Sequence, residues 1–99
     1  MIRHIVAWNY QDGFSASENE KNAQKIKDEL EALTNCINGI CELKVYINTL
    51  PSSDRDVMLD SLFESEEALA AYQTHPEHKK VSAFVGTVMT DRVCVDCFE

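Results

Sequence analysis

The feature that most constrains the fold is the apolar spacing, which changes along the chain between every second residue and every third or fourth. A spacing of two is typical of a strand, and a spacing of three and four is typical of an amphipathic helix. These patterns predict strands at about 2–9, 40–48, 57–63 and 91–98, and helices at about 17–36, 66–74 and from 76 onward. The resulting order is the split βαβ arrangement, an α+β class in which an antiparallel four-stranded sheet carries its helices on one face. Because the chain has 99 residues and no repeat or linker, we expect one domain over 1–99.

Capping residues predict where the helices begin and end. Ser17 and Glu20 have the spacing of a capping box, which satisfies the free amides at the start of the first helix. Gly39 suits the left-handed residue that commonly ends a helix, and Ser65 is a suitable cap for the second helix. Pro76 disfavours helical geometry at the preceding residue, yet it is well placed at the first position of a helix. We therefore expect a break there and a new helix from Pro76.

Apolar side chains occupy both faces of the predicted strands, although the helices can cover only one face. A strand with one solvent-exposed face should alternate apolar and polar residues. We therefore expect the uncovered face to pack against a second copy of the chain, sheet against sheet, in a symmetric homodimer. The alternative is that these residues are the scattered apolar groups found on most protein surfaces. The opposed sets are Ile2, Val6 and Trp8 against Ile5 and Ala7, and Ile40 and Tyr46 against Leu43, Val45 and Ile47.

Composition argues against several classes of partner. Nine basic and seventeen acidic residues give a net charge of -8, which opposes binding to nucleic acid or anionic lipid, because those affinities come largely from Lys and Arg. No apolar run reaches the ~18 residues of a membrane helix, and the first residues lack the pattern of a secretory signal. We expect a cytoplasmic protein that binds neither nucleic acid nor membrane.

The four cysteines predict neither a disulfide nor a metal site. Cys94 and Cys97 have C-x-x-C spacing, but residues three apart on a strand point to opposite faces and lie about 10 Å apart. Cys36 and Cys41 flank a turn and lack a histidine at zinc-finger spacing. We therefore expect all four to be small buried hydrophobic residues. No glycine-rich phosphate loop is present either, so we expect no metal and no cofactor.

His78 is the strongest candidate for chemistry. It would be the third residue of the helix that begins at Pro76, where the helix dipole disfavours the imidazolium form. The adjacent Lys79 and Lys80 act in the same direction. A neutral imidazole near pH 7 is what a general base requires. The alternative is a solvated histidine at the start of a helix.

Two further candidates lie on predicted apolar faces. His4 shares a face with Val6 and Trp8, so we expect it to be buried, and a neutral core histidine with one hydrogen bond is its plainer interpretation. Tyr72 lies on the apolar stripe of its helix, and its plainer interpretation is core packing with the hydroxyl group at the rim. His75 precedes the proline, and we expect it to shape the break and carry no chemistry.

Several segments of the chain resemble the stress-responsive A/B barrel (Dabb) family, and together they span almost the whole sequence. The tyrosine followed by His-Pro-x-His is the most specific of them. The resemblance implies a ferredoxin-like βαββαβ fold whose sheets pair into a dimeric α/β barrel. Most of the family has no established activity, and a plant branch cyclises polyketides. The segments are Arg3–Val6, Ser53–Arg55, Phe63–Ser65, Ala68–His78 and Asp91–Asp96.

The resemblance also implies roles for particular residues. The cyclising members use a histidine that matches His78 as acid and base, and a tyrosine that matches Tyr72 assists it. Their pocket lies between helices and sheet and includes a histidine that matches His4. Our hypothesis is that His4, Trp8, Tyr72 and His78 line such a pocket for a small apolar or aromatic ligand. As an enzyme, the protein would use His78 to remove a proton α to a carbonyl, and Tyr72 to orient it or to bond the enolate oxygen.

Three classes of function stay open, since one fold hosts many functions. The first is a non-catalytic dimeric domain that binds a small ligand or acts structurally under stress. The second is an enzyme, either a cofactor-free cyclase or isomerase or an oxygenase of the related dimeric-barrel type. The third is an oligomerisation module. A cavity that contains His4, Tyr72 and His78 would favour binding or catalysis, and a filled interior would favour assembly.

Overall fold

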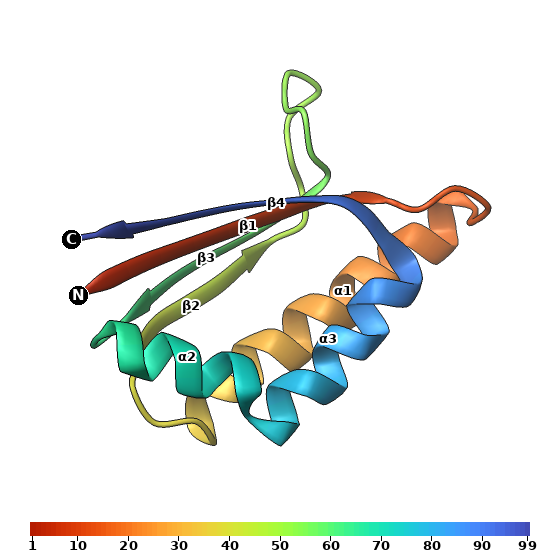
Figure 1. Ribbon diagram of the computed structural model, residues 1–99. Coiled ribbons are helices and arrows are strands. Elements are labelled where there is room, and N and C mark those ends of the chain that lie inside the picture. The colour runs from red at the N-terminus through yellow and green to blue at the C-terminus, as the bar shows by residue number, and fades with distance from the viewer.

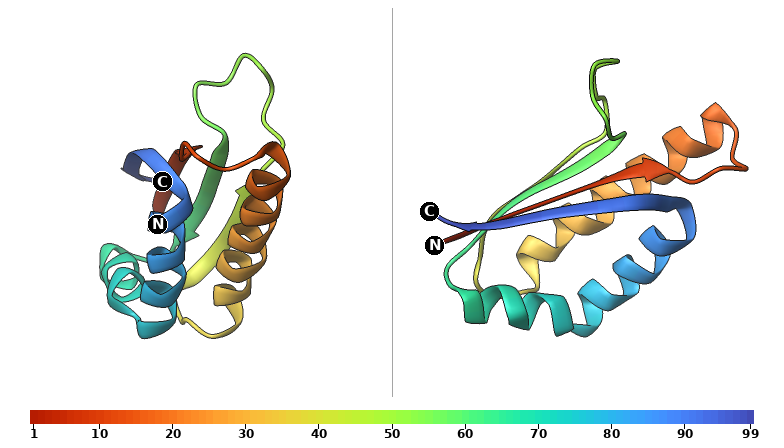
Figure 2. Two further views of the ribbon diagram at one scale, coloured as in Figure 1. Left: turned by 90° about the vertical axis from the view of Figure 1, so that its right-hand side faces the viewer. Right: turned by 45° about the horizontal axis from the view of Figure 1, so that its top comes forward.

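The computed structural model describes residues 1–99 and has the predicted order of elements (Figure 1). Its four-stranded sheet has the order β2-β3-β1-β4, and all three pairings are antiparallel. The α-helices lie on one face of this sheet (Figure 2). The elements are β1 (Ile2–Tyr10), α1 (Ala16–Ala32), the 3-10 helix η1 (Leu33–Asn35), β2 (Ile40–Tyr46), β3 (Val57–Phe63), α2 (Glu66–Thr74), α3 (Pro76–Val88) and β4 (Met89–Phe98).

The core lies between the helices and the face of the sheet that they cover. Alternate residues of β1 are buried, as expected for a strand with one face in the core. The predicted stripe of α1 is buried, whereas that of α3 is buried except for Phe84, which is only partly covered. These buried residues include Ile2, His4, Val6 and Trp8 of β1, Ala23, Ile26 and Leu30 of α1, and Val81, Val85 and Val88 of α3.

The N-cap of the first helix lies two residues earlier than predicted. Ser15 is the N-cap: its hydroxyl accepts from the amide of Glu18 at 3.1 Å, and the Glu18 carboxylate accepts from the amide of Ser15 at 3.0 Å. The predicted pair Ser17 and Glu20 has the same spacing but lies inside the helix, so that prediction was wrong. The helix also ends earlier, at Ala32, and η1 continues the turn.

Two irregularities change the register of the edge strands. Cys41 interrupts the register of β2, so Ile40 pairs with Phe63 and contacts the core instead of sharing a face with Glu42. A bulge of this kind reverses which residues face inward. In β4 the register shifts beside Asp91, whose φ is 53°, and the strand starts at Met89 rather than at 91.

The break between α2 and α3 agrees with the prediction. Pro76 is the first residue of α3, and His75 has an extended backbone. The Nδ1 atom of His75 accepts from the amide of Glu77 at 3.1 Å and so caps α3. His75 therefore shapes the break, as expected.

Gly39 has the predicted left-handed backbone, with φ of 91°, but it precedes β2 and does not end the first helix, and it lies against α2. A Cβ atom added at Gly39 would lie 2.7 Å from the Cβ of Ala68. Both the backbone conformation and the close approach therefore require glycine at this position.

The other face of the sheet, which we call the outer face, has no helix over it. Alternate residues of the two edge strands β2 and β4 reach solvent there, including Tyr46, Val93 and Val95. The loop 47–56 between β2 and β3 projects on the same side, away from the helices (Figure 1).

All four cysteines are exposed, so the expectation that they are buried was wrong. Three of them lie on edge strands, which neighbouring strands cover on one side only, and Cys36 follows η1. Cys94 is opposite Val6 and Cys97 is opposite Arg3, so these two point to opposite faces as predicted. None of the helices combines the length and the apolar character that a membrane span requires.

Candidate functional site

A cavity of about 240 Å³ lies between the sheet and α3. It contains all four residues that the sequence predicted to share a pocket: His4, Trp8, Tyr72 and His78. Half of its fourteen lining residues are hydrophobic, and the polar remainder includes residues of α3 and of the start of β4. The further lining residues are Val6, Leu30, Leu59, Ser82, Val85, Gly86, Met89, Thr90, Asp91 and Arg92.

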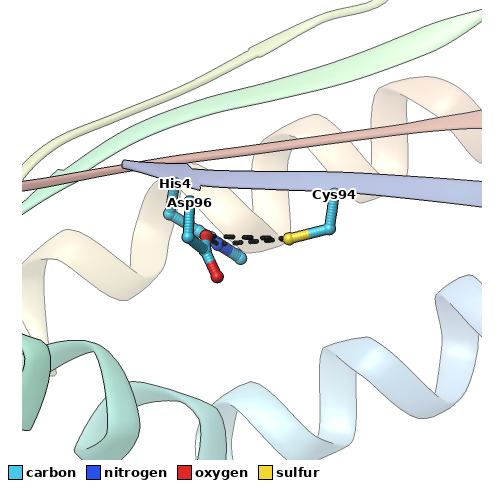
Figure 3. Close-up of side chains that lie close together, drawn as sticks. All are labelled: His4, Cys94 and Asp96. Atoms are coloured by element: carbon cyan, nitrogen blue, oxygen red, sulfur yellow. Dashed lines mark hydrogen bonds and ion pairs between the residues drawn. The ribbon is translucent and has the colours of Figure 1, made fainter. Parts of the chain in front are cut away.

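His4 is held by strand pairing and by a carboxylate. The His4 side chain is only 3% exposed. The backbone carbonyl of His4 accepts a hydrogen bond from the hydroxyl of Ser61 at 2.7 Å. Asp96 lies opposite His4 in the neighbouring strand, and its Oδ1 atom bonds to the imidazole Nδ1 (Figure 3). The Sγ atom of Cys94 lies 3.8 Å from the same nitrogen. The predicted single hydrogen bond to a core histidine is therefore made by an acidic side chain.

Tyr72 packs inside an aromatic cluster and is 1% exposed. Its ring lies 4.9 Å from that of Phe63 and 6.5 Å from that of His4, measured between centroids. The hydroxyl group is buried and has no hydrogen-bond partner in the protein. Since an unsatisfied buried donor is costly, this group is available to a bound molecule. Burial also raises the pKa of Tyr72, so the phenol keeps its proton and can donate it in a hydrogen bond.

His78 lies against Tyr72, with ring centroids 4.2 Å apart and planes at 44°. Its Nδ1 atom lies 3.3 Å from the backbone carbonyl of Gln73. A carbonyl only accepts, so Nδ1 carries the proton and Nε2 is left with a free lone pair. This tautomer is the one that a general base at Nε2 requires.

Burial of the ring is the main cause of a lowered pKa at His78. The hydrogen bond to Gln73 acts in the opposite direction, and the charges of His4, Arg92 and His75 add to the lowering. The direction agrees with the prediction, but its main cause is burial rather than the predicted helix dipole or the neighbouring lysines. Lys80 pairs with Glu77 instead.

The polar end of the cavity is formed where α3 passes into β4. Arg92 lines the cavity and is exposed, and it forms no ion pair within the chain. The carbonyl of Asp91 accepts from Nε of Arg55 at 2.9 Å, and its carboxylate contacts Asn9 at 3.4 Å. These contacts hold the left-handed turn at Asp91 that places Arg92 at the cavity.

Sequence reasoning missed three side chains of this region: Arg92, Cys94 and Asp96. Cys94 and Asp96 are two apart on a strand, so they share a face, and that spacing is visible in the sequence. Their meeting with His4 depends on the register of β1 with β4, which the apolar pattern does not define.

A model of the stress responsive A/B barrel domain matches residues 2–99. Among solved structures, a dimeric protein of unknown function and ferredoxin-like fold from Bacteroides fragilis is 28% identical, with a TM-score of 0.92 and coverage of 99% of this chain and 95% of that one. A dimeric ferredoxin-like protein of unknown function from Thermobifida fusca is 22% identical, with a TM-score of 0.83 and coverage of 99% and 90%.

A hydroxynitrile lyase from Passiflora edulis shares the fold at 18% identity, with a TM-score of 0.79 and coverage of 97% of this chain and 90% of that one. No curated protein matches the sequence significantly. The neighbours confirm the predicted ferredoxin-like fold, and the family model covers nearly every residue. The chain belongs to the stress-responsive A/B barrel (Dabb) family.

Proposed function

We propose that this protein binds a small, mostly apolar molecule with a carbonyl group in the cavity, and that His78 and Tyr72 transfer a proton within it. The observation that carries the proposal is the pair itself: a neutral imidazole against a buried phenol that has no partner. The dimeric-barrel fold is compatible with such chemistry, since one relative is a hydroxynitrile lyase.

The apolar walls favour a ligand that is largely hydrocarbon or aromatic. Trp8, Leu59 and Met89 supply such surface. The volume of about 240 Å³ is below the common range of roughly 300–1,000 Å³ for ligand pockets, which indicates a small ligand. A cavity of this kind supports binding over a purely structural role, for which a filled interior would serve better.

In the proposed reaction, Nε2 of His78 removes an acidic proton α to the carbonyl. The electron pair of the broken C–H bond moves into the enolate, whose oxygen accepts a hydrogen bond from Tyr72. A hydrogen bond that forms as charge develops accelerates the step, because the donor is already oriented and desolvated. The protonated His78 then returns its proton to carbon or oxygen. Arg92 at the open end is suited to hold a second, anionic oxygen of the ligand.

The test is proton exchange on model compounds. Small β-diketones and aromatic ketones are incubated with the protein in D₂O, and loss of the α-proton signal is followed by NMR. We expect His78→Gln to abolish catalysed exchange, and Tyr72→Phe to slow it about 100-fold, the order seen when one donor to a developing oxyanion is removed. His75→Asn is the matched control, because asparagine also caps a helix and His75 does not line the cavity.

Binding and catalysis are separated by a thermal-shift screen of the same compounds. A compound that stabilises both the wild type and His78→Gln, with equal exchange rates in the two, would refute the acid–base role and leave binding. No stabilisation by any small carbonyl or aromatic compound would refute the binding role as well.

We also infer that the outer face forms a symmetric homodimer. The relatives from Bacteroides fragilis and Thermobifida fusca are described as dimeric. On the outer face Val95 is 60% exposed, and Ile5 and Asp60 lie beside it in register. Leu50 is 72% exposed in the loop 47–56, which projects on this side and is suited to reach over a second copy (Figure 1).

Sedimentation at micromolar concentration tests the dimer. We expect the wild type to sediment as a dimer and Val95→Lys to sediment as a monomer, because the interface would desolvate the added ammonium group and lose the apolar surface of Val95. Ala71→Lys, on the exposed side of α2, is the control and should stay dimeric. A monomeric wild type would overturn the inference.

A further inference from the structure

Three side chains with different metal-binding atoms meet on the covered face of the sheet. His4 comes from β1, and Cys94 and Asp96 come from β4 (Figure 3). One ligand atom of each lies within 4.8 Å of the others. All three point from the sheet toward the helices (Figure 3). The cluster therefore presents an imidazole nitrogen, a thiol sulfur and a carboxylate oxygen to one point.

The spacing of these atoms is close to that of a tetrahedral zinc site. With bonds of about 2.0 Å to nitrogen and oxygen and about 2.3 Å to sulfur, donor atoms are roughly 3.3–3.6 Å apart. Here Sγ of Cys94 lies 3.6 Å from Oδ1 of Asp96 and 3.8 Å from Nδ1 of His4. The carboxylate contacts Nδ1 directly, so the exposed Asp96 has to rotate to admit an ion.

We propose that His4, Cys94 and Asp96 bind a divalent zinc-type metal ion. A set of nitrogen, sulfur and oxygen donors favours zinc or a similar transition metal, whereas magnesium and calcium prefer oxygen alone. Three protein ligands leave the fourth position to water or a ligand, as in catalytic rather than structural zinc sites.

The surroundings support a built site. The imidazole of His4 is buried, which restricts its rotation away from the cluster. Cys94 and Asp96 are fixed on one face by strand geometry, opposite Val6 and His4 in the register. The hydroxyl of Tyr72, which the proposed function also uses, is buried without a partner in the ring cluster next to His4.

This proposal departs from our sequence expectation that no metal is bound. The C-x-x-C pair does not form a site, because Cys97 faces the other side of the sheet. Cys94 and Asp96, which are two residues apart, lie on the same face and both approach His4. The inference goes beyond the proposed proton transfer and does not need His78, so either can fail alone.

The test is titration of the reduced, full-length protein with Co²⁺, which substitutes for zinc and reports its ligands by absorbance. We expect a thiolate-to-cobalt charge-transfer band and tetrahedral d–d bands that saturate at one ion per chain. Addition of Zn²⁺ should displace the cobalt. The two bands identify a sulfur ligand and the geometry without any assay of activity.

Matched variants assign the site. Cys94→Ser should remove the charge-transfer band, and Cys94→Ser and Asp96→Asn should each weaken binding beyond the roughly 10–100-fold cost of losing an outer-shell partner. Cys97→Ser, on the opposite face of the same strand, should bind like the wild type. Circular dichroism confirms that each variant is folded. Absence of a thiolate band, or a band that survives Cys94→Ser, would overturn the proposal.

Discussion

The buried hydroxyl of Tyr72 leads to a prediction about stability that runs opposite to the usual effect of removing a polar group. The side chain is 1% exposed, and its hydroxyl has no hydrogen-bond partner. Tyr72→Phe keeps the ring and its contacts with Phe63 and His78 and removes only the orphaned group. The protein without a ligand should therefore become more stable.

The magnitude follows from the cost of an unsatisfied buried donor, which is about 1–3 kcal/mol. We expect a gain in the free energy of unfolding at the lower end of that range, about 1 kcal/mol, because the adjacent cavity lets the ring relax. For a domain of this size, 1 kcal/mol corresponds to a rise in Tm of about 4–8 °C. The same variant should slow the proposed proton transfer, so stability and activity would change in opposite directions.

The assay is urea unfolding at fixed protein concentration, since a dimer's stability depends on that concentration. Tyr10→Phe is the control, because Tyr10 is only partly buried and lies outside the cavity, and its stability should hardly change. If Tyr72→Phe instead lowers stability by about 0.5–1.5 kcal/mol, the hydroxyl makes an ordinary hydrogen bond, and our reasoning is refuted.

Three further predictions test other parts of the structure. Because burial lowers the pKa of His78 from 6.5, the unfolded chain binds a proton first; stability should be greatest above pH 6.5 and fall as the pH drops from 6.5 to the lowered value. Urea unfolding against pH should show this loss in the wild type and a smaller loss in His78→Gln, and equal pH dependence would contradict the assignment. Ser15→Ala should lower the free energy of unfolding by about 1 kcal/mol and Ser17→Ala by much less, since only Ser15 caps α1; equal losses in thermal unfolding would refute the capping box. Gly39→Ala should cost at least about 1–2 kcal/mol from its left-handed backbone and its contact with Ala68. It should cost less in an Ala68→Gly background, where that contact is absent, and an equal cost in both backgrounds by urea unfolding would mean that the contact is irrelevant.

The sequence predicts the order of elements correctly because apolar periodicity is local. The boundaries are less predictable where two local signals are equivalent, as with the caps at Ser15 and Ser17. A bulge also cannot be predicted from the apolar pattern. The extra residue at Cys41 moves the side chain of Ile40 to the other face of the sheet without changing the residue types. The burial of the cysteines was wrong for a related reason: which strands form the edges depends on strand order, and strand order is not local.

The candidate site also has a part that local patterns predict and a part that depends on long-range register. His4, Trp8, Tyr72 and His78 each lie on an apolar face or at a helix start, so their meeting could be predicted from those faces together with the family resemblance. Asp96 reaches His4 only through the register of β1 with β4. Long-range register decides which polar side chains share a site, and a single sequence does not contain it.

The proline break explains how Tyr72 and His78 come into contact. In a continuous helix, residues six apart lie about 9 Å apart along the axis and about 120° apart around it, so their rings could not stack. Here Tyr72 lies in the last turn of α2 and His78 in the first turn of α3, and the rings are 4.2 Å apart. The extended backbone at His75, which the following proline favours, turns the chain between them. The His-Pro-x-His segment therefore has a geometric role: it ends one helix and starts another, so that the phenol of the first meets the imidazole of the second.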